Sequence, residues 1–537
     1  MREKADACFG RAVTVADMMR ARDERVERQR ALLARGSCVV SLTLNIAGEI
    51  KANQLLRDAF YEGMRLIDEQ LARNGVHTLE RVCVEAFTGF EGALAVDGEP
   101  RLVKALLCAI EDENAFGRLL DADVLCGDGQ KVSRSDIGRP CRKCLLCEGD
   151  AAVCARSRAH AAPELFAYAQ RVVRAYFCEK QADFVAGLAV KGLLYELVTT
   201  PKPGLVDCAN SGAHKDMDVF TFSRSASVLT PYFAQCARKG MALVAEAPPA
   251  LFAALRYLGQ CAEADMLRET GGINTHKGAI FALGILCAAY GRLLAQGVRP
   301  DGTTLGATCA EMCQETLIKE VSALSEGAQL TTGARQCLKG GLTGARGEAA
   351  GGYRSVTRHA LPVLKACLAS GMSLNDAGVC ALLMLMSVAE DTNVVGRSSV
   401  EKRAALMIEA RKILENLRQS PKSTNAPPPT SEAPPTSAAP PTSAAPPTRE
   451  AAPTSEALPT NAAPPTREAP PTSAATPTRE AAPTSEALPM DMRIVRDMDA
   501  RFIAERISPG GAADLLAITW FMHFVDTETC PAAINPA

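Results

Sequence analysis

The chain has almost no excess of charge of either sign. Its 59 lysines and arginines nearly balance 61 aspartates and glutamates, which leaves a formal net charge of −2 at pH 7. Proteins that bind nucleic acid or membrane surfaces through charge normally carry a basic excess. We therefore expect neither nucleic acid nor a membrane among the partners of this protein.

Long apolar runs are scarce as well. The nearest approach, at 515–525, is interrupted by His523 and falls short of the roughly 18 residues that a membrane span requires. The first ten residues, MREKADACFG, are charged and lack the apolar core of a signal peptide. We therefore expect a cytoplasmic protein in which the 20 cysteines are reduced thiols.

The 537 residues are too many for a single hydrophobic core, and the sequence pattern changes near residue 165. Residues 1–165 combine helical patterns with strand patterns at 39–46 and 79–87, which predicts an α+β or α/β domain. Helical periodicity dominates residues 170–420 and 490–537, which predicts an all-α multi-helix domain.

An insert of different composition interrupts this helical domain. Residues 421–489 consist mainly of Pro, Thr, Ala, Ser and Glu, and Pro-Thr recurs every six residues from 429 to 484. Such a sequence has too few large apolar side chains to bury a core. We predict a disordered tether, with a docking motif for a partner as the alternative.

A loop at 199–218, TTPKPGLVDCANSGAHKDMD, is dense in charge. It begins where Pro201 and Pro203 end an apolar helix. Lysine and carboxylate-held Mg²⁺ are what phosphate oxygens require, and the loop interleaves both residue types. A solvated surface turn is the alternative. The candidate triphosphate or metal ligands in this loop are Lys202, Asp207, Lys215, Asp216 and Asp218.

Three later segments have the same character. ETGGINTHKG at 269–278 opens an apolar helix, whose free backbone amides favour anions. GGLTGARGE at 340–348 permits close backbone approach, and EDTN at 390–393 ends a buried helix, where a carboxylate is costly unless paired, metal-bound or turned to water. We expect these segments and the loop to share one pocket. Their candidate ligand residues are Asn274, Thr275, Lys277, Gly278, Gly344, Arg346, Glu348 and, for a metal, Asp391.

Histidine is rare, with six in the chain. His214 and His276 fall in the Gly-flanked polar segments, which makes them candidates for acid or base catalysis. The alternative for both is a hydrogen-bonding scaffold role. Asp207 and Asp216 are further catalytic candidates, because a carboxylate can serve as a weak base.

The first domain holds a pair of acidic residues in GRLLDADV, at 117–124. On a strand, Asp121 and Asp123 point to the same face and can share a Mg²⁺ ion, as in nucleotidyl-transfer sites. The alternative is an acidic turn before Gly127. We count both aspartates as candidate catalytic and metal-binding residues.

A cysteine-rich segment, CRKCLLCEGDAAVCARSRAH, follows at 141–160. Cys144 and Cys147 have zinc-knuckle spacing, and Cys154 with His160 can complete a tetrahedral set. Reduced thiols of a packed core are an equally good interpretation. The segment also offers groups that grip phosphate, because an arginine binds a phosphate bidentately. These candidate phosphate-binding residues are Arg156, Arg158 and His160.

The runs SLTLNIAGEIK, TGFEGALAV, GRLLDADVL and CLLC…CARSRAH resemble the citrate lyase holo-acyl-carrier-protein synthase family over about residues 10–165. This family is also called apo-citrate lyase phosphoribosyl-dephospho-coenzyme A transferase. The resemblance implies transfer of a phosphoribosyl-dephospho-coenzyme A group onto a serine of the lyase's acyl carrier protein, with release of pyrophosphate. We then expect Asp121 and Asp123 to hold Mg²⁺ against the triphosphate.

The runs TTPKPGLVD…GAHKDMD, GGINTHKGAIFALG, LTGARGEA, DTNV and SPGGAADLLA resemble, in this order, the triphosphoribosyl-dephospho-coenzyme A synthase family. The resemblance implies that the 2′-hydroxyl of 3′-dephospho-coenzyme A attacks C1′ of the ATP ribose, expels adenine and retains the triphosphate. ATP is then a substrate, Mg²⁺ is expected, and His214 or His276 protonates the adenine.

The sequence therefore predicts a bifunctional transferase that makes the citrate lyase prosthetic group precursor and loads it. Two alternatives stay open. One is a zinc-stabilised binding module fused to an inactive or ATPase-like helical scaffold, and the other is the same synthase reaction serving malonate decarboxylase.

Overall fold

The computed structural model describes residues 9–147, 149–322, 344–391, 394, 400–419 and 492–530. Internal contacts divide the chain into one unit of residues 1–419 with 489–537 and a second of residues 420–488. The predicted disordered insert at 421–489 lies outside the described residues.

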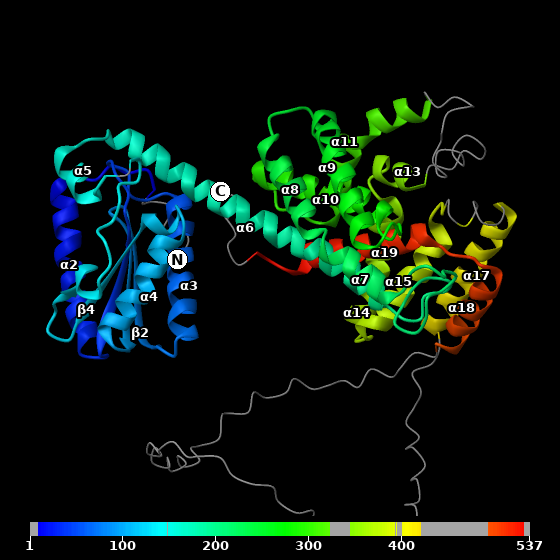
Figure 1. Ribbon diagram of the computed structural model, residues 1–537, viewed down its shortest axis with the longest axis horizontal. Helices are drawn as coiled ribbons and strands as arrows, with labels where there is room; N and C mark the ends of the chain where they lie inside the picture. Colours follow the sequence, from blue (N-terminus) through cyan, green and yellow to red (C-terminus); the bar gives the residue numbers. More distant parts are fainter. Residues whose placement is uncertain are drawn as a thin grey trace, which may run out of the picture. The chain divides into compact units, whose positions relative to one another are not determined.

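The first domain is α+β. Its sheet, in which Figure 1 labels β2 and β4, has five strands. Their order is β2-β3-β1-β4-β5, and every neighbouring pair is antiparallel. The sequence located the first two strands, and the antiparallel pairing favours α+β over the α/β alternative; β3 was not predicted. The elements are α2 (Val15–Leu33), β1 (Cys38–Leu44), α3 (Gln54–Arg73), β2 (His77–Ala86), β3 (Gly89–Asp97), α4 (Pro100–Glu113), β4 (Leu120–Cys126), β5 (Lys131–Val132) and α5 (Ala151–Ser157).

Helices cover both faces of this sheet. The helix α2 begins at a capping box formed by Thr14 and Asp17, as the sequence indicates, and its Leu32 packs on the sheet. On the other face, α3 and α4 bury residues such as Phe60 and Leu107 against the strands. The central strands β1 and β3 are therefore buried at most of their positions, whereas the edge strand β2 is mostly exposed.

The second domain is all-α, as predicted. The chain turns at Val228 and Leu229, which separates the helix that ends at Ser227 from the helix that begins at Thr230. The helices are α6 (Ala162–Val198), α7 (Val219–Ser227), α8 (Thr230–Ala242), α9 (Pro248–Glu269), α10 (Lys277–Ala295), α11 (Gly302–Ser322), α13 (Gly344–Ala350), α14 (Leu361–Ala369), α15 (Leu374–Val388), α17 (Val400–Gln419), α18 (Arg493–Glu505) and α19 (Gly510–Thr527).

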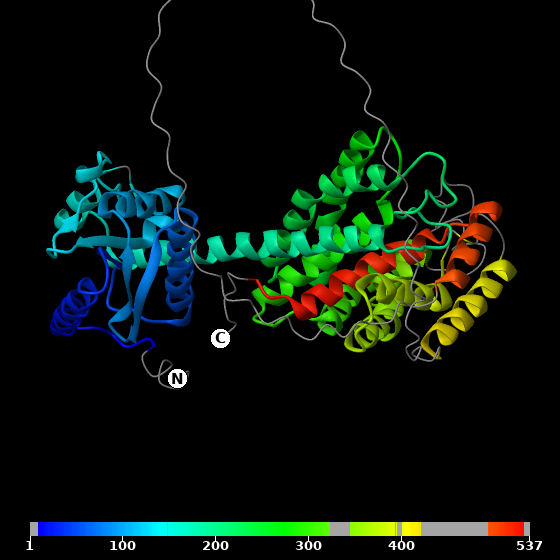
Figure 2. The ribbon, with the colours of Figure 1, turned by 90° about the horizontal axis from the view of Figure 1, so that it is seen from below.

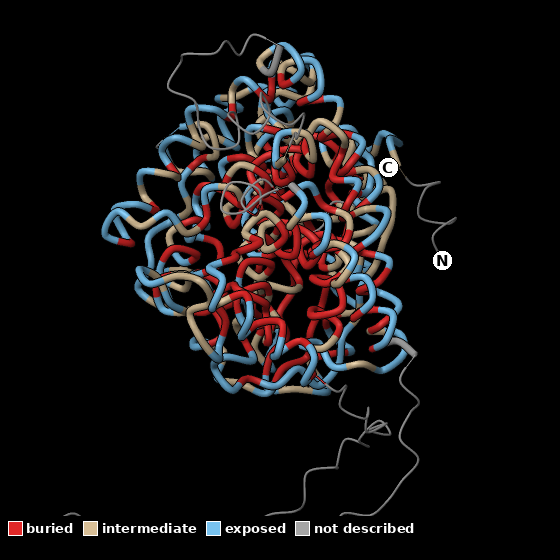
Figure 3. Tube along the Cα trace, turned by 90° about the vertical axis from the view of Figure 1, so that its right-hand side faces the viewer, coloured by how far each residue is buried: buried red, intermediate tan, exposed pale blue. Residues whose placement is uncertain are grey.

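The helix α10 forms the centre of this bundle. By length and composition it is apolar enough to cross a membrane, so the expectation that no run approaches that length is wrong. Most of the helix is buried against its neighbours, including α8, α9 and α11. Figure 3 shows such buried segments inside the molecule and exposed ones around them. Its apolar composition is thus that of a core helix.

The segment that follows the insert completes the helical domain. The helix α19 lies along α6 in both ribbon views, and Tyr195 packs edge-on against Trp520 (Figures 1 and 2). The carboxylate of Asp499 on α18 accepts hydrogen bonds from the Gly204 backbone N–H and from the Asn210 side chain, both at 2.9 Å. The loop at 199–218 is therefore held by residues nearly 300 positions away.

The long helix α6 crosses the expected domain boundary at 165–170 without a break. Its first half contacts the α+β domain, since the Tyr176 hydroxyl donates to Glu62 at 2.6 Å and the Tyr176 ring stacks on Phe116 at 4.0 Å. Its second half, from Ala182, belongs to the helical core.

Candidate active sites

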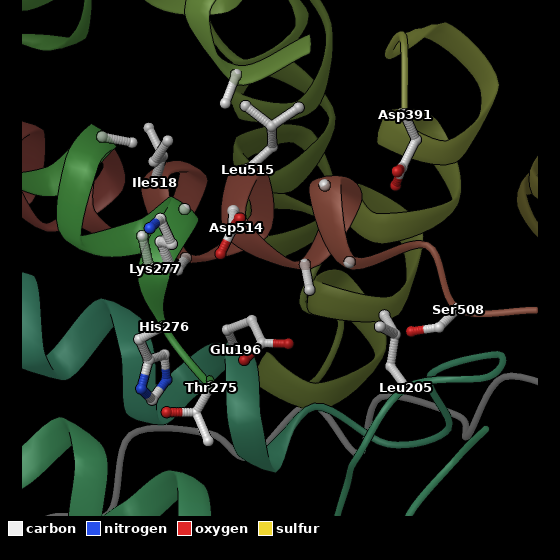
Figure 4. A pocket seen from close by; sticks show the side chains of 18 of the residues that line it. Glu196, Leu205, Thr275, His276, Lys277, Asp391, Ser508, Asp514, Leu515 and Ile518 are labelled. Carbon is white, nitrogen blue, oxygen red and sulfur yellow. The ribbon is translucent and has the colours of Figure 1, made fainter. Parts of the chain in front are cut away.

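The helical domain encloses a cavity of about 400 Å³ between α6, α10, α13, α19 and the loop at 199–218. The structure brings described residues of all four predicted polar segments together at this cavity, and Figure 4 shows part of the lining. The predicted residues that line it are His214, Asn274, Thr275, His276, Lys277, Gly278, Gly344, Glu348 and Asp391.

His276 precedes the first turn of α10 and is 3% exposed. Its Nδ1 is hydrogen-bonded to the Ser225 hydroxyl at 2.6 Å, and Thr275 donates to the same hydroxyl at 2.7 Å. Its Nε2 is buried without a hydrogen-bond partner. Burial, with a smaller effect of the nearby Lys202 charge, lowers the pKa of His276 to about 3. His276 is therefore neutral at pH 7.

His214 lies on the other side of the cavity. Its Nε2 is hydrogen-bonded to the Ser508 hydroxyl at 2.9 Å. Pro509, and not Ser508, holds the N-cap position of α19, and it makes no side-chain cap bond. The Ser508 hydroxyl instead makes a hydrogen bond with His214. This bond connects the loop at 199–218 to the segment before α19.

Two carboxylates at the cavity lie at helix N-termini. Asp391 accepts a hydrogen bond from the Ala512 N–H at the start of α19, at 3.0 Å. Asp514 accepts one from the Ala279 N–H at the start of α10. Burial first, and then repulsion from Glu196 and Asp391, raises the pKa of Asp514 well above its usual range. These carboxylates therefore occupy positions that suit anions.

Glu196 is a lining residue that the sequence did not reveal. It is buried on α6 and forms an ion pair with Lys202, which is 1% exposed. Burial raises the pKa of Glu196 even though Lys202 opposes this effect. Lys202 was predicted to bind triphosphate, but it does not line the cavity. Its buried ammonium group pairs with Glu196 instead, because a buried charge needs a counterion.

The described lining is strongly acidic. It contains Glu348 and Glu390 in addition to Glu196, Asp391 and Asp514, whereas Lys277 is the only lysine or arginine among its described residues. Lys277 also pairs with Glu263 at 2.7 Å. A polyphosphate cannot enter such a site alone, because like charges repel in a low-dielectric cavity. Divalent cations resolve this conflict.

The remaining predicted residues of the helical domain lie outside this lining. Asp207 accepts hydrogen bonds from the backbone N–H groups of Lys202, Ala209 and Asn210, so its carboxylate shapes the loop. Asp218 caps α7 through Thr221. Lys215 and Asp216 are exposed. Arg346 faces a neighbouring cavity beside Glu320.

In the first domain, Asp121 and Asp123 do lie on one strand, β4, with both side chains on the less buried face. Each has a cationic neighbour. Arg142 donates to Asp121 at 3.1 Å, and Lys131 pairs with Asp123. The two carboxylates are therefore adjacent to positive charge, as groups near a phosphate site are.

A second cavity, of about 440 Å³, lies beside this strand. Glu111 is buried there and pairs with Arg134 at 2.6 Å and with Arg142. The predicted residues Arg158 and His160 line the cavity, whereas Asp121, Asp123 and the exposed Arg156 do not. Three arginines that line it were not predicted from the sequence: Arg118, Arg134 and Arg142.

The cysteine-rich segment forms one wall of this cavity. Potential ligand atoms of Cys144, Cys147, Cys154 and His160 all lie within 4.8 Å of one another. Burial opposes ionisation of the Cys144 thiol, but backbone N–H groups of Leu146 and Cys147 lower its pKa to about 7. The four residues of the sequence-predicted zinc set are thus brought together.

Comparison with known proteins agrees with this division. Residues 182–431 and 472–531, more than half of the chain, match the family model described as ATP:dephospho-CoA triphosphoribosyl transferase. The chain belongs to this family. Residues 13–176 match the family model of apo-citrate lyase phosphoribosyl-dephospho-CoA transferase. The chain is therefore a fusion of two transferase regions, and it is an enzyme.

Curated relatives are similar to this chain over most of their own length. "Protein CitXG" of Haemophilus influenzae is 32% identical over 73% of this chain and 84% of its own length. "Protein CitXG" of Leuconostoc mesenteroides subsp. cremoris is 32% identical over 72% of this chain and 85% of its own. The "2-(5''-triphosphoribosyl)-3'-dephosphocoenzyme-A synthase" of Pectobacterium atrosepticum is 33% identical over 63% of this chain and 87% of its own.

Proposed function

We propose that the helical domain converts ATP and 3′-dephospho-coenzyme A into 2′-(5″-triphosphoribosyl)-3′-dephospho-coenzyme A and adenine. The observation that carries this proposal is the acidic cavity at the start of α10, within the matched transferase region. The first domain then transfers the product to a serine of the citrate lyase acyl carrier protein and releases pyrophosphate. We place both steps in the cytoplasm.

The triphosphate is held through Mg²⁺ in this proposal. The donor set fits the ion, since Asp391 and Glu348 offer the oxygen ligands that Mg²⁺ prefers. Among the described residues, no group of three carboxylates lies close enough together to hold a metal ion alone, so the ion would share its ligands between protein and phosphates, as Mg²⁺ commonly does. Lys277 and the first amides of α10 face the remaining phosphate charge.

Adenine leaves in a substitution at an anomeric carbon. The bond between ribose C1′ and adenine N9 breaks, and a bond forms between C1′ and the 2′-oxygen of dephospho-coenzyme A. The hydroxyl proton passes to a carboxylate, for which Asp514 is suited because its raised pKa makes it a better base. The adenine requires a proton donor. We assign this role to His214, because His276 is neutral at pH 7.

In the first domain we assign phosphate binding to the arginines of the second cavity. Arg142 pairs with both Glu111 and Asp121, and Arg158 lines the same cavity. Asp121, which contacts Arg142, and Asp123 would supply carboxylate ligands for a second Mg²⁺, whose charge would favour loss of pyrophosphate from the triphosphate.

Adenine release tests the first activity. The full-length protein is mixed with ATP, 3′-dephospho-coenzyme A and Mg²⁺, and adenine is quantified by chromatography. We expect one adenine per product molecule and none when the magnesium is chelated. An absence of adenine in the complete mixture would favour the alternative of an inactive or ATPase-like scaffold.

The carrier protein tests the second activity. Apo-carriers of citrate lyase and of malonate decarboxylase are supplied separately, and the mass gained by each is measured. We expect loading of the citrate lyase carrier alone, because the first domain matches the apo-citrate lyase transferase family. Preferential loading of the malonate decarboxylase carrier would support the rival assignment.

A further inference from the structure

The segment at 141–160 folds so that four separated side chains meet. Backbone hydrogen bonds from Cys144 N to Gly149 O, at 2.7 Å, and from Ala151 N to Arg142 O, at 2.9 Å, close a short hairpin around Cys147. Asp150 then caps α5 by accepting from the Ala152 N–H at 2.7 Å. This fixes the start of the helix that carries Cys154.

The end of α5 returns the last side chain to the same place. Arg158 has a left-handed backbone, with φ of 51°, and the Ala159 N–H donates to the Cys154 carbonyl at 3.1 Å. The chain therefore reverses within a few residues and brings His160 back to the cysteines. The Nε2 atom of His160 is buried without a hydrogen-bond partner. A buried imidazole nitrogen without a partner costs free energy unless a ligand satisfies it.

The spacing of the sulfur atoms matches a tetrahedral metal site. Zinc–sulfur bonds of about 2.3 Å at tetrahedral angles separate two sulfurs by about 3.8 Å. The Sγ atoms of Cys147 and Cys154 are 3.6 Å apart. A disulfide would need a separation of about 2.05 Å, and it would leave the other two side chains without a role.

Packing of reduced thiols does not account for the cluster. Cys147 is exposed, Cys154 is only half-buried, and core thiols are normally fully enclosed. Cys141, which has the same three-residue spacing before Cys144, stays outside the group. The fold thus selects a Cys₃His set from four cysteines and one histidine.

We propose that Cys144, Cys147, Cys154 and His160 bind a structural zinc ion. Four protein ligands leave no open position for a substrate, which is the arrangement of structural zinc sites. Binding releases the three thiol protons and leaves a site with one net negative charge, because three thiolates outweigh Zn²⁺.

The zinc site holds one wall of the second cavity. The hairpin carries Arg142, and the turn after α5 carries Arg158, so a single ion fixes the positions of both guanidinium groups. The Arg118 guanidinium donates to the carbonyls of Lys143 and Cys144, which places positive charge beside the anionic centre. The inference stands independently of the proposed function, because zinc content can be measured without any substrate.

The test is metal analysis of the full-length chain purified without chelators. We expect about one zinc per chain in the wild type and loss of at least four fifths of it in Cys147→Ser, Cys154→Ser and His160→Ala. Cys141→Ser is the matched control, since it removes an exposed thiol of the same hairpin, and it should retain the zinc. His160→Cys should also retain it, because a Cys₄ set binds zinc equally well.

Cobalt substitution provides a second measurement if a variant fails to fold. Wild-type protein stripped of metal and reloaded with Co²⁺ should show thiolate-to-cobalt charge transfer and the strong visible bands of a tetrahedral site. A zinc-free wild type that gives no such bands, a Cys147–Cys154 disulfide in its place, or loss of zinc in Cys141→Ser would each overturn the assignment.

Discussion

Gly278 lies directly against the Asp514 carboxylate. A methyl group on Gly278 would come within 1.9 Å of Asp514 Oδ2, which is far closer than two atoms can approach. The absence of a side chain at this position therefore lets a carboxylate from α19 reach the N-terminus of α10. The glycine was predicted from the sequence as a phosphate-binding residue, and the structure gives it a contact with a neighbouring carboxylate.

Replacement of this glycine should damage the synthase site. We expect Gly278→Ala to displace the Asp514 carboxylate, to lower the rate of adenine release about 100-fold and to cost about 1–3 kcal/mol of unfolding free energy. Gly187→Ala is the matched control, because Gly187 is also helical and an added Cβ meets nothing within 4 Å. An unchanged rate of adenine release in Gly278→Ala would contradict a role for this contact.

Replacement of Asp514 should increase stability and abolish activity. The pKa of Asp514 is higher in the folded state than in the unfolded chain, so the unfolded chain ionises first as the pH rises. The wild type therefore loses stability above about pH 3.8. We expect Asp514→Asn to raise the unfolding free energy at pH 7 by about 1–2 kcal/mol while adenine release is lost. Chemical denaturation at pH 4 and pH 7 checks this, since the gain should shrink at the lower pH.

The neutral state of His276 predicts an opposite pH dependence. Its pKa falls from 6.5 in the unfolded chain to about 3 in the fold, so its contribution is complete above pH 6.5 and lost as the pH falls. We expect the wild type to lose about 1.4 kcal/mol more per pH unit than His276→Asn between pH 6.5 and 3. Parallel denaturation curves for the two proteins across this range would show that His276 is charged in the fold.

The sequence revealed those parts of the site that local chemistry marks. Polar segments with glycine or proline identify loops and helix starts, so His276, Lys277 and Asp391 could be located before their neighbours were known. Glu196 could not, because it lies within a continuous helix and only tertiary packing shows that it faces the cavity.

Burial also changed the role of residues that had been located correctly. Lys202 stands among polar residues in the sequence, yet the fold buries it against Glu196. The carboxylates of Asp207 and Asp218 accept hydrogen bonds from backbone N–H groups. A sequence pattern cannot distinguish this role from ligand binding. The cysteine spacing was more informative, because a tight hairpin and a seven-residue helix leave few ways to place the four side chains.

A substitution of Asp121 should separate the two activities. The carboxylate accepts from Arg142 on the first domain and is remote in sequence from every residue of the synthase cavity. We expect Asp121→Asn to leave adenine release unchanged and to lower carrier loading at least about 100-fold, because a neutral amide holds Mg²⁺ against the triphosphate more weakly than a carboxylate does. Asp128→Asn, in the exposed turn after the same strand, is the control that should leave both activities intact.

Purified triphosphoribosyl product is supplied to both variants and the mass of the carrier is followed, so that loading is measured independently of synthesis. Equal loss of both activities in Asp121→Asn would show that the two sites are coupled.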